Sequence, residues 1–192
     1  MTASAIKLSM TPEEAAACGM VIALHAEVAP DRPAILSPLG DRTYAALNAR
    51  SNQLVRALRS AGLKEGDAVA LLCANRPEFV ETCVALSRCG MRLTPINWHL
   101  TAEEIGYIVE NCEAKSFIAD ARFAEKAAEA SAMSPHLVQK LAGAGEIAGF
   151  TSYDEALAAE PAHNIEDPTA GTQMLYTSGT TGHPKGVYRK AA

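Results

Sequence analysis

The stretch GDAVALLCANRPEF, residues 66–79, gives the clearest indication of the fold. Its apolar run Ala68–Cys73 is uninterrupted, as is typical of a short strand that other elements cover on both faces. Gly66-Asp67 before the run indicates a turn. Pro77 after it suits the first turn of a helix, because its missing N–H would have no helical partner there. The stretch therefore predicts a buried strand followed by a helix.

Strand and helix signals alternate in the same way along the rest of the chain. Helices are predicted at about 43–60, 77–90, 101–112, 121–132 and 152–159, and strands at 68–73, 92–96, 116–119 and 172–176. Residues 137–141 fit either a strand or a helix, and residues 161–168 have the composition of a connector. This alternation predicts the α/β class, with layers of helices around a largely parallel sheet.

Two of these helices have recognisable starts. Thr43 can cap the helix at 43–60, and Thr101 and Glu104 have the spacing of a capping box, in which each satisfies a free backbone donor of the other. The predicted buried faces are Leu47, Leu54, Val55 and Leu58 for the helix at 43–60, and Phe79, Val80, Cys83 and Val84 for the helix at 77–90.

The composition indicates a globular chain with an acidic balance. Of the 192 residues, 48% are hydrophobic and 20% charged, and 17 basic against 22 acidic side chains give a net charge of −5. This length corresponds to one domain, or part of a larger one, at about 150 residues per domain. The negative charge argues against nucleic acid or an anionic lipid surface as a partner. With no apolar run of about 18–20 residues and no secretory signal, the expected location is cytoplasmic.

The cysteines and histidines indicate neither a disulfide framework nor a metal site. The number of cysteines, five, is odd, and no pair has C-x-x-C spacing. We therefore expect buried free thiols in a reducing compartment. The five histidines show no metal-ligand spacing, so no metal ligand is predicted. No catalytic residue is assigned within the chain.

The stretch that carries chemistry is YTSGTTGHPKGV, residues 176–187. It holds four Ser or Thr hydroxyls, three glycines and one lysine. Glycines let backbone N–H groups approach a ligand, hydroxyls bond phosphate oxygens, and a lysine supplies a mobile positive charge. Because the loop follows a predicted strand, we expect it at the carboxyl edge of the sheet, where α/β proteins bind ligands. It therefore predicts a clamp for nucleotide phosphates.

The spacing within this loop excludes two common phosphate clamps. In a Walker A loop the lysine is followed by Ser or Thr, whereas Lys185 is followed by Gly186. The Gly-x-Gly-x-x-Gly pattern of dinucleotide-binding proteins is also absent from the sequence. Neither a P-loop NTPase nor a nicotinamide-dependent dehydrogenase is therefore indicated.

Residues Met174–Lys185, MLYTSGTTGHPK, resemble the AMP-binding signature of the adenylate-forming superfamily. This superfamily includes acyl- and aryl-CoA synthetases, luciferases and amino-acid adenylation domains. Other segments that resemble the family occur in the expected order at 41–47, 66–70, 75–79, 95–97 and 100–104. The resemblance extends from His25 to Val187. Asn97 in the Pro-Ile-Asn segment is more similar to acyl-CoA synthetases than to amino-acid adenylating domains.

The resemblance implies a two-step ligase that uses ATP, Mg²⁺ and coenzyme A. A carboxylate, here a fatty acid, would attack the α-phosphorus of ATP, and the sulfur of coenzyme A would then displace AMP. Thr177, Ser178 and Thr180 are expected to contact phosphate directly, and Lys185 is expected to act as a mobile charge. The residues expected to hold the departing pyrophosphate are Thr177, Ser178, Gly179, Thr180, Thr181, Gly182 and Lys185.

The resemblance also implies a division of the chain. Residues 1–24 would form an N-terminal extension and residues 25–192 the first part of the AMP-binding domain, with the rest of that domain and the C-terminal domain absent. The activity is then expected of the parent enzyme, and the chain alone is expected to be incomplete and inactive. Two alternatives remain: an aryl or amino-acid adenylating enzyme, and a non-catalytic fragment that binds nucleotide or associates with itself. A homo-oligomer would form through an exposed sheet edge.

Overall fold

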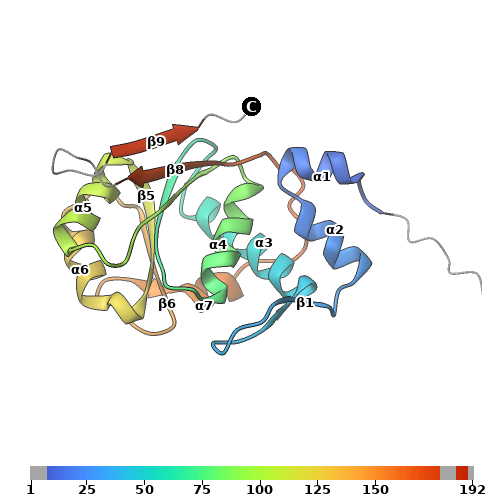
Figure 1. Ribbon diagram of the computed structural model, residues 1–192, viewed down its shortest axis with the longest axis horizontal. Helices are drawn as coiled ribbons and strands as arrows, with labels where there is room; N and C mark the ends of the chain where they lie inside the picture. The colour runs from blue at the N-terminus through green and yellow to red at the C-terminus, as the bar shows by residue number, and fades with distance from the viewer. Residues whose placement is uncertain (1–7, 178–184, 190–192) are drawn as a thin grey trace, which may run out of the picture.

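The computed structural model describes residues 8–177 and 185–189 (Figure 1). Its main feature is a seven-stranded sheet with the strand order β7-β6-β5-β3-β4-β8-β9. Neighbouring strands run parallel except β8 and β9, which are antiparallel. The α/β class with a largely parallel sheet is thus confirmed. The strands are β3 (Ala68–Leu72), β4 (Arg92–Pro95), β5 (Ala114–Asp120), β6 (Gln139–Gly143), β7 (Thr151–Ser152), β8 (Thr172–Thr177) and β9 (Lys185–Arg189), and β1 (Pro33–Ile35) and β2 (Arg42–Thr43) form a separate small sheet.

Helices cover both faces of the large sheet. One face packs against the first four helices and α7, and the other against α5 and α6. This arrangement explains why the central strands are apolar on both sides. The helices are α1 (Pro12–Cys18), α2 (Val21–Val28), α3 (Tyr44–Ser60), α4 (Pro77–Ser87), α5 (Ala102–Asn111), the short 3₁₀ helix η1 (Ala121–Phe123), α6 (Ala124–Ala132) and α7 (Tyr153–Ala158).

Strand β3 shows how the sequence pattern becomes a two-sided core. All five of its residues are buried. Val69 and Leu71 join the cluster under α3 and α4, whereas Ala70 and Leu72 join the cluster under α5 and α6. Successive side chains of a strand point to opposite faces, so an uninterrupted apolar run supplies both layers at once. The buried strand predicted at 68–73 is therefore confirmed.

The predicted helix starts are confirmed as well. The Thr43 hydroxyl accepts from the Ala46 amide at 3.1 Å, and the four predicted core residues of α3 are buried. In the capping box of α5, the Glu104 amide donates to Thr101 Oγ1 at 3.2 Å and the Thr101 amide donates to Glu104 Oε2 at 2.8 Å. These bonds from Thr101 lower the pKa of the Glu104 carboxyl group.

The buried face of α4 differs from the predicted one. The helix begins at Pro77, as predicted, but ends at Ser87 rather than near Gly90. The four residues predicted to face the core, Phe79, Val80, Cys83 and Val84, are only partly buried. The buried face is instead formed by Pro77, Glu78, Glu81, Thr82, Ala85 and Leu86. Glu81 can occupy this face because β2, α3 and α7 supply it with partners, as described below, whereas Thr82 donates to the Glu78 carbonyl within the helix.

The ambiguous segment at 137–141 is resolved by pairing with its neighbour. Residues 139–143 form β6, whose backbone pairs in parallel with β5 from Ser116 to Asp120. A short apolar segment has no internal signal that separates strand from helix, and the open side of β5 decides in favour of a strand. Gly145 and Gly149 after it have positive φ values of 150° and 78°, a backbone conformation that glycine adopts most readily.

The N-terminal helices pack into the same core. Met20, Ala23 and Leu24 belong to the cluster that includes Leu54 and Leu58 of α3. The boundary predicted between residues 24 and 25 falls within α2, and the division into an extension and a domain remains a prediction.

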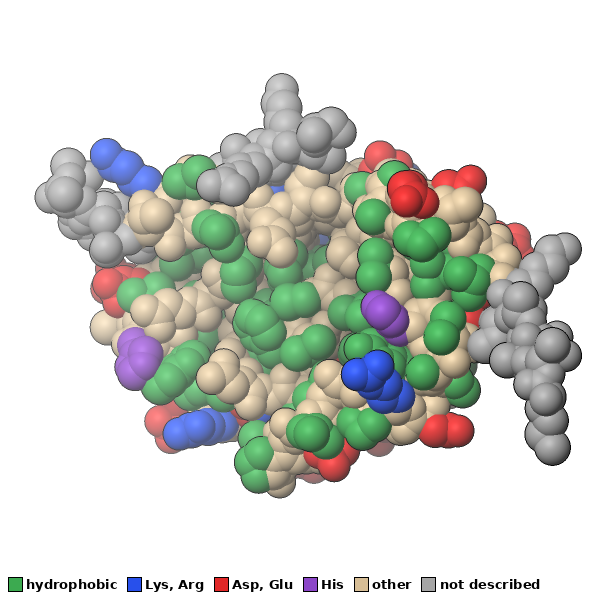
Figure 2. Space-filling model, turned by 45° about the vertical axis from the view of Figure 1, so that its right-hand side comes forward, with side chains coloured by type: hydrophobic (Ala, Val, Ile, Leu, Met, Phe, Trp, Pro, Cys, Tyr) green, Lys and Arg blue, Asp and Glu red, His purple; other side chains and the backbone are tan. Residues whose placement is uncertain are grey.

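Hydrophobic side chains gather across the centre of the face drawn in Figure 2, and charged side chains lie mostly toward its rim. Among the described residues, the exposed large hydrophobic side chains include Leu175 and Val187, at 47% and 48% exposure. Both belong to the β8–β9 hairpin.

Within the described ranges, no helix combines the length and the apolar character that crossing a bilayer requires.

Gly171 guides the chain into β8, and we expect its replacement by alanine to lower the free energy of unfolding by about 2 kcal/mol. Its amide donates to the Ser87 carbonyl at 3.0 Å, and a Cβ at this position would overlap the Leu86 carbonyl oxygen. Because that oxygen belongs to the backbone, either α4 or β8 must move. Urea denaturation measures the loss.

The matched control is Gly143→Ala, since a Cβ there would meet nothing closer than 3.8 Å. We expect this control to stay within about 0.5 kcal/mol of the parent chain. Equal effects of the two substitutions would contradict the role given to Gly171.

Candidate functional site

Polar side chains follow the parallel strands where these end. Asp120 closes β5, Asn97 follows β4 by two residues, and Thr177 closes β8. Because β5, β3, β4 and β8 run parallel, their carboxyl ends meet at one edge of the sheet. This edge is where open α/β sheets bind ligands, and it includes the strand end that precedes the predicted phosphate loop.

Two of the predicted phosphate-binding residues lie within the described part of the chain. Thr177 and Lys185 stand opposite each other in the antiparallel pairing of β8 with β9. Both are exposed, so a hydroxyl and an ammonium group are available at the two ends of the loop. The other predicted residues, Ser178, Gly179, Thr180, Thr181 and Gly182, lie outside the described residues. The phosphate-binding role of the set stays a prediction.

A charged cluster lies where β3 and β5 end. Arg76 Nε lies 3.2 Å from Glu78 Oε2 and 3.8 Å from Asp120 Oδ2. Burial, followed by the negative charges of Asp120 and Glu78, raises the pKa of the Cys73 thiol to about 12. Cys73 is therefore a neutral thiol near neutral pH, which gives it little nucleophilic character. All five cysteines are free.

An aromatic group lies where β4 ends and η1 begins. The Trp98 ring stacks on His99 with a centroid distance of 3.5 Å and on Phe123 at 5.5 Å. The Arg122 guanidinium lies 5.8 Å from the centroids of both the Trp98 and Phe123 rings. Trp98 is partly buried and packs against the core under α5 and α6. The ring thus links the segment after β4 to the segment after β5.

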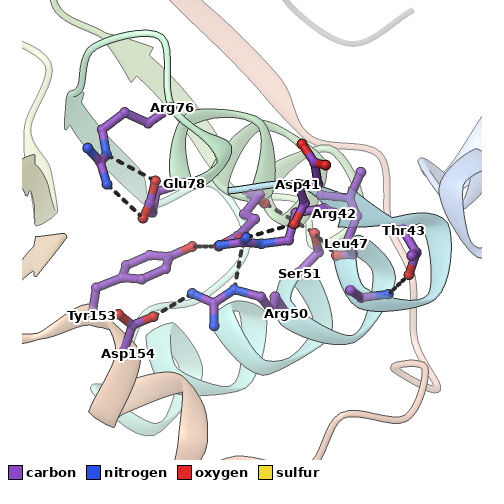
Figure 3. Close-up of polar contacts among 12 residues, drawn as sticks. Asp41, Arg42, Thr43, Leu47, Arg50, Ser51, Arg76, Glu78, Tyr153 and Asp154 are labelled. Atoms are coloured by element: carbon purple, nitrogen blue, oxygen red, sulfur yellow. Dashed lines mark hydrogen bonds and ion pairs between the residues drawn. The ribbon is translucent and has the colours of Figure 1, made fainter. Parts of the chain in front are cut away.

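A polar network centres on Glu81, which was not predicted from the sequence, and Figure 3 labels its partners Arg42, Arg50 and Tyr153. The Glu81 side chain is fully buried. Its Oε1 accepts from Arg42 Nε and Arg50 Nε, both at 2.7 Å, and its Oε2 accepts from the Tyr153 hydroxyl at 3.0 Å. Arg50 also bonds Asp154 at 2.6 Å. The network therefore ties β2, α3, α4 and α7 together.

The charges around Glu81 fit a structural role in holding the helices together. Burial, and then the charge of Glu81, raises the pKa of the Tyr153 hydroxyl well above its usual value. Burial opposes the charge of Arg50, but the bond and charge of Glu81 outweigh it and raise the pKa of Arg50. The Tyr153 hydroxyl therefore stays protonated and Arg50 stays charged near neutral pH, and both Glu81 oxygens accept hydrogen bonds. No local pattern marks Glu81, because its partners lie 31 to 72 residues away.

The described residues contain no candidate metal site. Across residues 8–177 and 185–189, no three His, Cys, Asp or Glu side chains are grouped so that they could hold an ion. What the described edge offers a ligand is a hydroxyl and an ammonium group at the ends of one loop, which suits an anion with several oxygens.

Comparison with known proteins shows the family. The sequence profile described as "AMP-binding enzyme" matches residues 22–192. Fatty acid–[acyl-carrier-protein] ligase ScoC of Streptomyces coeruleorubidus is 33% identical over 164 residues, which are 85% of this chain and 31% of that protein. Long-chain-fatty-acid–CoA ligase FadD13 of Mycobacterium tuberculosis is 35% identical over 173 residues, 88% of this chain and 34% of that protein.

A solved structure shares the fold. The anthranilate CoA ligase AuaEII, crystallised with anthranoyl-AMP, matches with a TM-score of 0.82 and 24% identity over 89% of this chain and 34% of that chain. The chain spans about a third of the length of the curated relatives it matches. Because the family profile covers nearly all of the chain, the chain belongs to the AMP-binding enzyme family, and the relatives that it resembles are adenylate-forming ligases.

Proposed function

We propose that this chain supplies the first part of an enzyme that activates a fatty acid with ATP and transfers it to coenzyme A. The observation that carries the proposal is the opposed pair Thr177 and Lys185. These exposed residues bound the signature loop at the carboxyl edge of the sheet. Relatives named as fatty-acid ligases support the acyl substrate.

In the first step, a carboxylate oxygen attacks the α-phosphorus of ATP and the bond to the β-phosphate oxygen breaks. Pyrophosphate leaves with that electron pair, and an acyl-adenylate remains. The Thr177 hydroxyl would donate to phosphate oxygens, and the Lys185 ammonium would offset the charge of the leaving pyrophosphate. Donors fixed before the reaction stabilise such developing charge most strongly.

In the second step, the sulfur of coenzyme A attacks the acyl carbon and AMP leaves, which forms a thioester. Mg²⁺ would enter with ATP and neutralise phosphate charge, and no protein ligand for it is assigned among the described residues. We propose that residues 25–192 form the first part of the AMP-binding domain, after an extension at 1–24, and that the chain alone is inactive. A cytoplasmic location is proposed because all five thiols are free, as in reducing compartments.

The test is ATP–pyrophosphate exchange by the full-length protein that carries this chain. Fatty acids of increasing chain length are compared with anthranilate, benzoate and the amino acids. Exchange with fatty acids, followed by AMP release on addition of coenzyme A, is the expected result. Exchange with only the aryl acids or only the amino acids would show that the substrate belongs to that class and is not a fatty acid. No exchange with any carboxylate would contradict the proposal.

A second candidate function is self-association, and the β8–β9 hairpin favours it. Among the described strands, β9 pairs only with β8, so its other edge is open. Leu175 and Val187 expose 47% and 48% of their surface on the same hairpin. An open edge beside apolar side chains is a template for pairing with a second copy of the chain. Light scattering tests it: a dimer converted to monomer by Val187→Lys is expected, and a monomeric parent chain would contradict it.

A further inference from the structure

The hairpin that carries the signature loop is only half attached to the sheet. In the described structure, β8 pairs with β4 through two residues, Thr172 and Gln173. From Met174 to Thr177, its recorded pairing is with β9 alone. The half of β8 that leads to Thr177 therefore extends beyond the parallel sheet, and backbone pairing with β4 does not fix its position.

Side chains on one face of this half-strand attach it to the helices instead. Met174 and Tyr176 pack against the core under α5 and α6. The Tyr176 hydroxyl donates to Asn111 Oδ1, at the last residue of α5, with a distance of 2.6 Å. Burial raises the pKa of the Tyr176 hydroxyl, so it remains a donor at neutral pH. Tyr176 thus joins the free half of the hairpin to a helix that is itself packed on the sheet.

The strand opposite leaves room for this ring. Gly186 of β9 faces Tyr176 in the register. A Cβ at Gly186 would overlap the end of the Met174 side chain and would lie 3.1 Å from Tyr176 Cζ and 3.3 Å from its hydroxyl oxygen. A side chain at Gly186 would therefore crowd both of the residues that attach this half-strand to the helices. The pair Thr177 and Lys185 is the next one along the ladder, so any shift of Tyr176 is passed directly to the two ends of the loop.

We propose that Tyr176, held by Asn111, is a positioning residue that fixes Thr177 and Lys185 for the polyphosphate of ATP. The proposal rests on the proposed function. Tyr176 does not touch the reacting atoms; it acts through the two neighbouring loop ends. A small misplacement of groups that position a substrate can reduce turnover markedly.

The test compares Tyr176→Phe and Asn111→Ala in the full-length protein, with Tyr44→Phe as the matched control. Tyr44 lies on α3, on the other side of the sheet, and stacks on His25. Each test variant is expected to raise the KM for ATP about 3- to 10-fold, the range for loss of a single hydrogen bond. The KM for the carboxylate should stay within about 2-fold, because the proposed contact acts on phosphate positioning. The double variant should be no worse than either single one.

Hydrogen exchange of backbone amides separates this proposal from the proposed function. Amides of 174–177 and 186–188 are expected to exchange faster in both variants than in the parent protein, whatever the protein binds. If the parent protein shows no ATP–pyrophosphate exchange while the amides behave as expected, the proposed function fails, but the attachment of the hairpin by Tyr176 and Asn111 stands. Unchanged amide exchange and an unchanged KM for ATP in both variants would overturn the positioning role proposed for Tyr176. A fall in thermal stability with equal rises in the KM values for ATP and for the carboxylate would show that the contact between Tyr176 and Asn111 only stabilises the fold, and would also overturn the proposal.

Discussion

Glu81→Gln is expected to lower the free energy of unfolding by about 3 kcal/mol, since removing one partner of a buried ion pair costs about 3–5 kcal/mol. We expect the lower end of this range because the side chains of Arg42 and Arg50 keep 20% and 24% exposure and remain partly hydrated. Urea denaturation followed by circular dichroism measures the loss.

The size of this effect follows from the geometry of the carboxylate. Its two oxygens accept three hydrogen bonds, two of them from guanidinium groups. Glutamine has nearly the same shape but only one acceptor oxygen and no charge. The variant therefore leaves Arg42 without the carboxylate that it bonds and Arg50 with Asp154 alone, and it places an amide donor against the donors around it. The helices α3, α4 and α7 and the strand β2 lose the side chain that links them.

Asp154→Asn is the matched control within the same network. Asp154 bonds Arg50 at 2.6 Å, but its side chain is 65% exposed. Exposed ion pairs contribute about 0.2–1 kcal/mol, so this control is expected to lose less than about 1 kcal/mol. Similar losses in the two variants, or a Glu81→Gln chain as stable as its parent, would show that burial does not give Glu81 its importance.

The second large effect concerns ligand binding. Lys185→Ala in the full-length protein is expected to raise the dissociation constants of pyrophosphate and ATP about 10- to 100-fold. A hydrogen bond to a charged group contributes about 1.5–3 kcal/mol, and about 1.4 kcal/mol corresponds to tenfold. Thr177→Ala removes a neutral donor and is expected to weaken binding about 3- to 10-fold. Isothermal titration with pyrophosphate reports both constants.

Lys64→Ala is the control for general loss of positive charge. Lys64 is exposed in the turn before β3, away from the signature loop in the sequence, and should leave the dissociation constants within about 2-fold. Since Lys185 is also exposed, its removal should change the free energy of unfolding by less than about 0.5 kcal/mol. Equal affinity of the Lys185→Ala variant and its parent would remove the role proposed for this residue.

The sequence alone determined the elements whose signals are local. The apolar run Ala68–Cys73 specified a strand covered on both faces, and the Thr101–Glu104 spacing specified a helix start that the hydrogen bonds confirm. The signature from Met174 to Lys185 indicated the family. Each of these signals lies within a few residues of chain and depends on backbone geometry or on a contiguous motif.

The tertiary structure alone decided the features that join distant segments. Apolar periodicity placed Phe79, Val80, Cys83 and Val84 in the core, but the helix buries Glu81 because partners from positions 42, 50 and 153 satisfy its charge. Residues 139–143, which overlap the ambiguous segment 137–141, form a strand because they pair with the open edge of β5. The attachment of Tyr176 to Asn111 joins residues 65 positions apart. A buried charge or an unpaired strand edge is stable only when its partner is present, and the folded chain, not the local sequence, supplies that partner.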